Sequence, residues 1–376
     1  MLAISQANYN GDRPHCKLES FDKHVAPMAR SASIWRVGQT MKAIKYAAKG
    51  VAQIADMGVP QLKPGHALVH VRAAGLCHTD IDVLHGRYGE GKFPLVPCHE
   101  YAGVVQALAE DVSGLEVGAR VAVDPNIPCG ACRSCRKGLT NLCSNLKAYG
   151  VTNDGGFAEY SLVKVDHLHD IGDLPFETAA LAEPLGCVLN GLDSAGLKTG
   201  PFGTETALVF GGGPIGLLLA LSLKARGVES VTVADINESR LAFAAELGLT
   251  PIVSGSEELA AQKRQFDFVA DATGIASVVE GMIDYTADGG TALVFGVCAP
   301  DVRISVAPFE IFRRQIKLVG SHSLNQNIPE AINILKRDKG AMARLVSHRL
   351  QLSEVLLFLS KGAAGAATMK VQYKAD

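Results

Sequence analysis

With 376 residues, the chain exceeds the length at which a single hydrophobic core keeps growing, so we expect two domains. Apolar residues make up 48% and charged residues 20%, a balance that is ordinary for a globular protein and argues against a disordered one. The formal net charge of −2, without a long run of Lys or Arg, argues against a protein that holds nucleic acid through its phosphates. The expected partner is therefore a small molecule.

The nine cysteines do not indicate a secreted disulfide framework, because the chain is large and does not open with a charged start followed by an apolar core. We expect a reducing, cytoplasmic location, in which clustered cysteines usually bind metal. Residues 1–40 have no clear apolar period and are expected to form a plain extension. Arg and Ser residues between positions 30 and 36 are a weak organelle-targeting signal, and the acids at positions 12, 19 and 22 argue against it.

Short apolar alternations separated by Gly and Pro begin at Met41. They predict strands, among them residues 67–71 and 101–105, in a mostly β, barrel-like domain. Beyond about Gly186, strands alternate with helices. Strands are expected at residues 207–210, 231–234, 250–253, 267–271, 291–295 and 316–319. This order predicts an α/β domain with a doubly wound parallel sheet of the Rossmann type.

The charge-free stretch at residues 206–223 approaches the length of a membrane span. Three consecutive glycines and Pro214 inside it predict a strand, a tight turn and a buried helix instead, so we expect no membrane span. A helix at residues 328–335 and a strand at 369–373 are expected to return to the first domain. The expected division is an extension at 1–40, a catalytic domain at 41–185 and 325–376, and a dinucleotide-binding domain at 186–324.

A Gly-x-Gly-x-x-Gly motif at residues 211–216 follows a predicted strand and opens a helix, the context that makes the match informative. Gly211 permits the turn, Gly213 lets the backbone approach a pyrophosphate, and Gly216 lets helix and strand pack closely. Pro214 and Ile215 complete the loop. The motif predicts a nicotinamide dinucleotide site, and the alternative is a tight turn without a ligand.

Asp235 ends the next predicted strand, 19 residues after Gly216. An acid at this place accepts hydrogen bonds from the adenosine ribose hydroxyls, which favours NAD because a carboxylate repels a 2′-phosphate. Arg240 lies close enough in the sequence to leave NADP open. The competing interpretation makes Asp235 the N-cap of the helix that follows.

A cluster of four cysteines, Cys129, Cys132, Cys135 and Cys143, has the spacing Cys-x2-Cys-x2-Cys-x7-Cys. This spacing lets four thiolates bind one tetrahedral zinc. An iron–sulfur cluster is the alternative, but its usual run has a shorter last gap followed by proline. A zinc with four protein ligands cannot bind substrate, so we expect a structural ion that fixes a lobe without a core of its own.

A second group of potential metal ligands is dispersed along the chain. Cys77 follows a predicted strand and His99 precedes another, so a thiolate and an imidazole can share a metal that keeps one position open. Glu183 is a candidate to close this set. Taken singly, the three residues are more simply a buried cysteine, a core histidine and a helix-start acid.

Together these motifs resemble the zinc-containing medium-chain alcohol dehydrogenases, particularly the polyol branch that includes sorbitol and arabinitol dehydrogenases. The resemblance extends from about Met41 to the C-terminus. It rests on five motifs in the family's order: the Cys-His-Thr-Asp run at 77–80, the His-Glu pair at 99–100, the four cysteines, the Glu-Pro pair at 183–184 and the glycine loop. It implies two zinc ions per chain, hydride transfer between a secondary alcohol, such as arabinitol or sorbitol, and NAD(P), and a homodimer or homotetramer.

The resemblance implies that Cys77 and His99 bind the catalytic zinc. Glu183 stands where ethanol-type enzymes have a cysteine and polyol enzymes a glutamate. Glu100 is similar to the neighbouring acid that can approach or exchange at the metal. We therefore expect Glu100 to bind transiently and Glu183 to bind directly or through water.

Two further residues resemble family members that act beside the zinc. Asp80 is similar to the carboxylate that orients the histidine, and Thr79 to the hydroxyl that takes the substrate proton. The chain departs from the family at Cys98, where glycine is frequent. It also departs at Asp82, where many relatives have a histidine that passes the proton onward, and the nearest histidine is His85.

Two other activities share this zinc pattern and remain alternatives: threonine dehydrogenase and butanediol dehydrogenase. A nucleotide-binding structural protein without turnover is a third alternative. Such relatives generally lack the zinc ligands, so the sequence favours an enzyme.

Overall fold

The computed structural model describes residues 39–197, 203–361 and 368–376. The predicted extension at residues 1–40 therefore lies outside the described residues, except for its last two positions. All eight cysteines within the described ranges are free thiols. None of the helices in this part of the chain combines the length and the apolar character that a membrane span requires.

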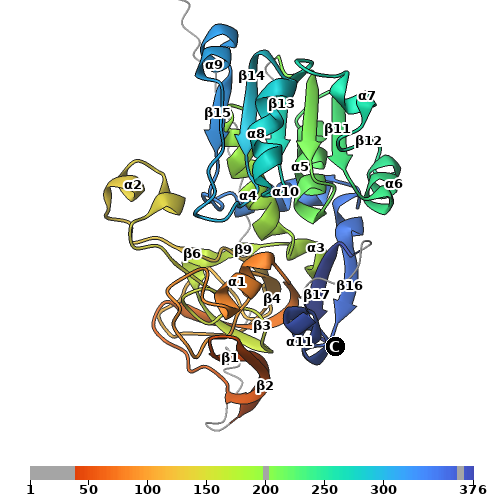
Figure 1. The fold of residues 1–376 in the computed structure, drawn as a ribbon. Coiled ribbons are helices and arrows are strands. Elements are labelled where there is room, and N and C mark those ends of the chain that lie inside the picture. Colours follow the sequence, from red (N-terminus) through yellow and green to blue (C-terminus); the bar gives the residue numbers. More distant parts are fainter. Residues whose placement is uncertain (1–38, 198–202, 362–367) are drawn as a thin grey trace, which may run out of the picture. The chain divides into compact units, whose positions relative to one another are not determined.

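Six parallel strands form one sheet in the order β12-β11-β10-β13-β14-β15 (Figure 1). They are β10 (Thr206–Phe210), β11 (Ser230–Asp235), β12 (Thr250–Val253), β13 (Phe266–Asp271), β14 (Thr286–Val294) and β15 (Lys317–Gly320). Because the chain order reverses on either side of β10, the sheet is doubly wound, as the sequence predicts. β14 begins before the predicted residue 291, in a polar, glycine-rich run that shows no apolar alternation.

Helices cover both faces of this sheet, and successive strand residues enter different cores. Val209 joins a core with α4 (Ala182–Ser194) and α5 (Pro214–Ala225). Leu208, on the opposite face, joins a core with α7 (Glu257–Ala260) and α8 (Ala276–Tyr285). This alternation with period two explains the nearly continuous apolar runs from which the strands are predicted.

A second sheet has seven strands, in the order β16-β17-β3-β4-β5-β9 with β8 also paired to β3. They are β3 (His66–Gly75), β4 (Glu100–Leu108), β5 (Arg120–Val123), β8 (Tyr160–Lys164), β9 (Leu168–Asp170), β16 (Val346–Leu350) and β17 (Lys370–Lys374). All of these pairs are antiparallel except β16 with β17. Two C-terminal strands thus lie in one sheet with strands from the first part of the chain.

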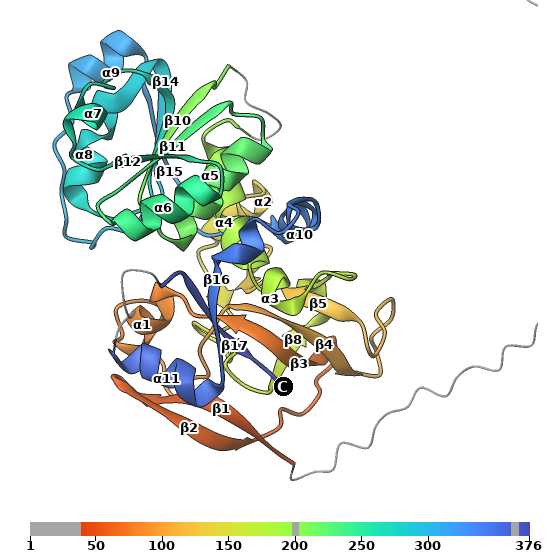
Figure 2. The same ribbon diagram turned by 90° about the vertical axis from the view of Figure 1, so that its right-hand side faces the viewer.

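A hairpin of β1 (Thr40–Ala48) and β2 (Val51–Gly58) packs beside α11 (Leu352–Lys361), as Figure 2 shows. Tyr46 and Val355 belong to the same buried core as Tyr101 of β4 and Val69 of β3. The C-terminal segment is therefore tied to β1, β3 and β4 by apolar packing as well as to β3 by strand pairing.

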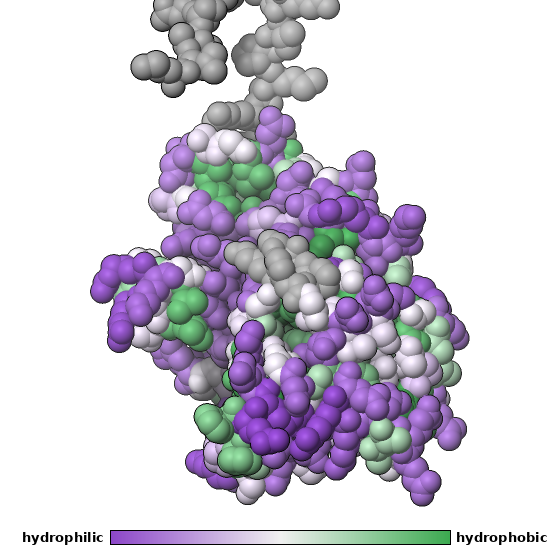
Figure 3. Space-filling model, turned by 90° about the horizontal axis from the view of Figure 1, so that it is seen from above, coloured by the Kyte–Doolittle hydropathy of each residue, from purple (hydrophilic) through white to green (hydrophobic). Residues whose placement is uncertain are grey.

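Shorter elements complete the described chain. They are α1 (His78–Leu84), α2 (Arg133–Arg136), α3 (Phe176–Ala179), α6 (Glu238–Glu246), α9 (Pro308–Arg314), α10 (Ile328–Arg337), β6 (Asn126–Ile127), β7 (Lys147–Ala148) and the 3₁₀ turns Thr140–Leu142, Val165–His167 and Met342–Leu345. Figure 3 shows that polar side chains dominate the face seen from above, with separate apolar patches between them.

Candidate active site

Strand pairing brings the first candidate ligands together. β3 and β4 pair with Gly75 opposite Glu100, so Cys77, just after β3, comes close to His99, just before β4. A Cβ atom at Gly75 would lie only 2.3 Å from the Glu100 Oε2 atom, so a side chain here would displace the Glu100 carboxylate. Cys77, His99 and Glu100 each offer a ligand atom, and these atoms lie within 4.8 Å of one another.

Asp80 joins the two segments that carry these ligands. Its fully buried carboxylate accepts hydrogen bonds from the backbone N–H of Cys77 (2.9 Å) and of Cys98 (3.1 Å). Burial raises the pKa of Asp80 to about 6, and the nearby His99 opposes this shift. The His99 Nδ1 atom lies 3.7 Å from Asp80 Oδ1, which is too long for a hydrogen bond. In this structure Asp80 therefore ties the backbone at Cys77 to the backbone at Cys98, which directly precedes His99.

Cys98 has a backbone conformation that favours glycine, with φ of +83°. This explains why a glycine suits this place, as the resemblance implies. Its buried thiol donates to the carbonyl oxygen of Gly75 at 3.4 Å, and a Cβ at Gly155 would lie 2.0 Å from the Cys98 carbonyl oxygen. Cys98 lies outside both clusters of potential metal ligands in the described chain.

Glu183 lies in the first turn of α4, is buried, and belongs to neither cluster. Burial raises its pKa to about 7, against the opposing effect of His99. The thiol of Cys187, one turn later on α4, donates to Glu183 Oε1 at 3.4 Å. Cys187 was not predicted from the sequence. Its i, i+4 spacing from Glu183 could have indicated that the two side chains lie on the same face of a helix.

Lys370 is a second site residue that the sequence does not reveal. This buried side chain on β17 places its Nζ atom 2.6 Å from each carboxylate oxygen of Glu100. The two residues are 270 positions apart, and no local pattern links them. Because the pair is buried, removing one partner would leave an uncompensated charge beside the candidate metal.

The predicted proton-transfer residues lie in α1 or at its C-terminal end. Thr79 is half-buried in its first turn, two residues after Cys77. His85 is exposed at the C-terminal end of α1. Asp82 accepts a hydrogen bond from Arg87 Nε at 2.8 Å. Within the described chain, neither His85 nor Asp82 bonds to Thr79, so the structure does not link them into a relay.

The chemistry of the first donor set fits a divalent cation. Cys77, His99 and Glu100 offer a thiol, an imidazole and a carboxylate within 4.8 Å of one another in a mostly buried region. Burial disfavours the charged His99 imidazole, but Cys77 and Asp80 raise its pKa well above the ordinary value. Thiolate, imidazole and carboxylate are the ligands that zinc uses when it keeps a position open.

The four-cysteine lobe has a second, closed donor set. The Sγ atoms of Cys129, Cys132, Cys135 and Cys143 lie within 4.8 Å of one another. Backbone N–H groups point at the sulfurs, including Cys132 to Cys129 Sγ (3.4 Å) and Asn145 to Cys143 Sγ (3.3 Å). Such groups lower the pKa of Cys132, whereas desolvation and the neighbouring Cys132 thiol raise that of Cys135. Four thiolates at this distance therefore need a cation, and tetrahedral zinc fits.

This lobe lacks apolar packing of its own, as predicted for a metal-held segment. No residue of α2 is buried. Polar contacts connect the lobe to a distant loop: the Thr140 N–H and hydroxyl both donate to Asn325 Oδ1, at 3.0 and 2.8 Å. A bound ion would supply the cross-link that a core supplies elsewhere.

The glycine loop has the geometry that a dinucleotide requires. Gly211 follows β10 with φ of +104°, and Gly213 is the N-cap of α5, with Pro214 in the first turn. A Cβ at Gly216 would lie 1.8 Å from the Gly211 carbonyl oxygen, so only glycine lets α5 pack against this turn. The first backbone N–H groups of α5 are free of helical partners and can face a pyrophosphate.

Asp235 ends β11 beside this loop, and its buried carboxylate accepts from the N–H of Gly212 (2.6 Å) and of Asn237 (2.8 Å). The N-cap of α6 is Asn237, not Asp235, because the Asn237 side chain accepts from the Arg240 N–H. Because a carboxylate can accept about four hydrogen bonds, these two leave Asp235 able to accept more from ribose hydroxyls. Arg240 Nη1 lies 3.7 Å from Asp235 Oδ2 and reaches the same region.

Comparisons with known proteins agree with this arrangement. Residues 63–173 match the alcohol dehydrogenase GroES-like domain, and residues 214–337 match the zinc-binding dehydrogenase domain. D-altritol 5-dehydrogenase of Agrobacterium fabrum is 67% identical over 336 residues, which cover 89% of this chain and all of the relative. The chain belongs to the zinc-containing medium-chain alcohol dehydrogenases. D-arabinitol dehydrogenase 1 of Uromyces fabae is 32% identical over 86% of this dehydrogenase and 94% of the relative.

Solved structures show the same fold. A zinc-binding dehydrogenase of Sinorhizobium meliloti, bound to NADP, superposes with a TM-score of 0.84 at 31% identity over 90% of this dehydrogenase and all of that chain. An alcohol dehydrogenase of Escherichia coli in complex with NADH gives 0.81 at 28% identity over the same shares. The fold class predicted from the sequence is therefore confirmed. The protein is a zinc-dependent, NAD(P)-linked oxidoreductase.

Proposed function

We propose that this dehydrogenase oxidises a secondary hydroxyl of a polyol, with D-altritol as the first candidate and NAD as the preferred acceptor. The observation that carries the proposal is the 67% identity to D-altritol 5-dehydrogenase over the whole of that enzyme. The arabinitol dehydrogenase relative also acts on a polyol. By analogy with D-altritol 5-dehydrogenase, the hydroxyl at carbon 5 would be the one that is oxidised.

The proposed catalytic metal ligands are Cys77 and His99, with an acid beside them. Bound zinc would supply a Lewis acid that lowers the pKa of a substrate hydroxyl, and the nicotinamide would supply the hydride acceptor. Thr79, two residues from Cys77, would take the hydroxyl proton, and Asp80 would hold the ligand-bearing segments in place. The onward route of the proton, through Asp82 or His85, stays a prediction.

The two acids would have different tasks. Glu100 lies within the set of ligand atoms, and its charge is balanced by Lys370 at 2.6 Å. Glu183 lies outside that set, with Cys187 donating to its carboxylate. This supports contact of Glu183 with the metal through a water molecule or a second substrate hydroxyl. An oxygen ligand of this kind suits a substrate with neighbouring hydroxyls.

The domain division and the assembly stay predictions. The catalytic domain would comprise residues 41–185 and 325–376, and the dinucleotide-binding domain residues 186–324. The pairing of β17 with β3 supports the return of the C-terminal segment. The resemblance implies that the chains assemble into a homodimer or a homotetramer.

Initial rates with a substrate panel test the proposed activity. The panel holds D-altritol, arabinitol, sorbitol, threonine and butanediol, each with NAD and with NADP at full zinc occupancy. We expect the highest kcat/KM for D-altritol with NAD. A threonine or butanediol value about tenfold above every polyol would overturn the polyol assignment, and absence of turnover with all substrates would favour a non-catalytic protein.

A further inference from the structure

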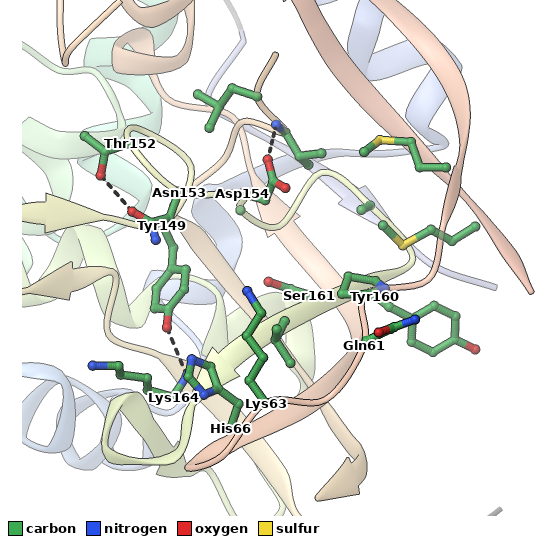
Figure 4. Close-up of a pocket in the computed structure, with 18 of the residues that line it drawn as sticks. Gln61, Lys63, His66, Tyr149, Thr152, Asn153, Asp154, Tyr160, Ser161 and Lys164 are labelled. Carbon is green, nitrogen blue, oxygen red and sulfur yellow. Dashed lines mark hydrogen bonds between the residues drawn. The ribbon is translucent and has the colours of Figure 1, made fainter. Parts of the chain in front are cut away.

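A cavity of about 740 Å³ lies between the β1–β2 hairpin, the segment at residues 60–66, the loop at 149–155 and β8 (Figure 4). None of the proposed catalytic metal ligands lines it. Figure 4 shows Lys63, His66 and Lys164 on one side and the loop residues Thr152, Asn153 and Asp154 on the other. We call this cavity the β8 groove. Its volume is in the range of small-molecule sites.

The basic side of the β8 groove is built by strand register and a turn. His66 and Lys164 are directly opposite one another in the antiparallel pair of β3 and β8, so their side chains share one face. The backbone N–H of His66 donates to the Lys63 carbonyl oxygen, which brings the second lysine to the same place. The register and the turn thus place two lysines and a histidine along one side of the groove.

Neither Lys63 nor Lys164 forms an ion pair with a residue in the described ranges. Two acids lie nearby, Asp111 and Asp154, and Asp154 itself lines the groove on the side opposite the lysines. Asp111 Oδ1 accepts from the Gly65 N–H at 3.0 Å, and Asp154 Oδ1 from the Val96 N–H at 2.9 Å. Lys147 also lines the groove. On a chain with net charge −2, the β8 groove is thus a local concentration of positive charge.

The remaining lining is suited to hydroxyl groups. Gln61 and Asn153 offer amide donors and acceptors. The Tyr149 hydroxyl accepts from the Lys164 backbone N–H at 2.9 Å, so its own proton is available to a ligand. Nδ1 of His66 lies 2.7 Å from the Pro64 carbonyl oxygen and donates to it, which leaves Nε2 to face a ligand. A ligand here can therefore be recognised by both its charge and its hydroxyls.

We propose that the β8 groove binds a phosphorylated polyhydroxy compound, with the phosphate monoester beside Lys63, His66 and Lys164 and the hydroxyls beside Gln61 and Asn153. Two ammonium groups and an imidazole match the charge of a phosphate monoester. The volume of the groove, which is open to solvent at the exposed Lys63 and Lys164, suits a molecule the size of a sugar phosphate. This site is separate from the catalytic ligands, and the proposal does not depend on the identity of the substrate.

Isothermal titration of the zinc-loaded, NADH-saturated enzyme tests the proposal with three probes: sorbitol 6-phosphate, sorbitol and inorganic phosphate. We expect sorbitol 6-phosphate to bind at least about tenfold more tightly than either other probe. The double substitution Lys63→Gln with Lys164→Gln should weaken that binding by about tenfold or more. Lys317→Gln, which removes an exposed lysine on β15, is the matched control and should leave it unchanged.

Three results would overturn the proposal. Equal affinity of sorbitol 6-phosphate for the wild type and the double variant would place the compound elsewhere, including the catalytic site. Equal affinity of sorbitol 6-phosphate and inorganic phosphate would show unspecific ionic attraction. No heat of binding up to about 10 mM would show that the β8 groove has no affinity for this class. Equal thermal midpoints of the wild type and the two variants would confirm that all three proteins are folded.

Discussion

The glycine loop allows stability and cofactor binding to be separated by two matched substitutions. In Gly216→Ala, the new Cβ would lie 1.8 Å from the Gly211 carbonyl oxygen. In Gly213→Ala, three positions earlier, the nearest atom to the new Cβ is Arg240 Nη1 at 4.0 Å. The first substitution therefore collides with backbone, and the second enters the space expected for the pyrophosphate.

The magnitudes follow from these contacts. Overpacking against backbone costs about 3 kcal/mol or more, because no side chain can rotate away. The better helix propensity of Ala returns at most about 1 kcal/mol, so Gly216→Ala should lower the free energy of unfolding by about 2 kcal/mol or more. Gly213→Ala should change it by less than about 1 kcal/mol, since Gly213 is an N-cap without a side-chain bond.

Urea unfolding of the zinc-loaded enzyme without dinucleotide measures the stability change, and NADH fluorescence titration measures affinity. Gly213→Ala should keep its urea midpoint close to that of the wild type while its Kd for NADH rises about tenfold or more. Equal stability of the two variants would refute the predicted backbone collision at Gly216. Wild-type affinity of Gly213→Ala for NADH would show that the pyrophosphate does not approach Gly213.

Three other substitutions probe the two metal sites and the cofactor site. Cys132→Ser should remove one zinc per chain and lower the thermal midpoint, and retention of both ions in metal analysis would contradict the structural site. Asp235→Ser should shift the NADP/NAD ratio of kcat/KM upward by about tenfold, and an unchanged ratio would show that other residues choose the cofactor. Glu183→Cys should lower kcat/KM for a polyol more than for a matched secondary monoalcohol. An unchanged ratio at full zinc occupancy would place the polyol preference in the pocket walls.

The parallel sheet was predictable because its strands are buried on both faces. Residues such as Leu208 and Val209 enter opposite cores, so the strand appears in the sequence as an apolar run ending at glycines. The start of β14 was not predictable in this way, since Thr286 to Gly290 is polar and glycine-rich. Its pairing with β13, not its own pattern, makes it a strand.

The candidate ligands were predictable as residue types, but their neighbours were not. Short spacing reveals the four-cysteine cluster directly. The contact of Lys370 with Glu100 depends on the pairing of β17 with β3, and no local pattern encodes it. The β8 groove likewise depends on the register that places His66 opposite Lys164. At Cys98 the sequence shows only that a cysteine stands where glycine is frequent. The structure supplies the reason for the glycine, a positive φ at this residue.

Polyol oxidation by this dehydrogenase should depend on a zinc held by Cys77 and His99. Zinc content and kcat/KM for D-altritol, measured on the wild type and on His99→Ala, test it most directly. We expect two zinc ions per chain and turnover in the wild type. In His99→Ala we expect one zinc ion, retained by the four cysteines, and a loss of turnover of about a thousandfold or more. A His99→Ala variant that keeps wild-type turnover of D-altritol would contradict the account.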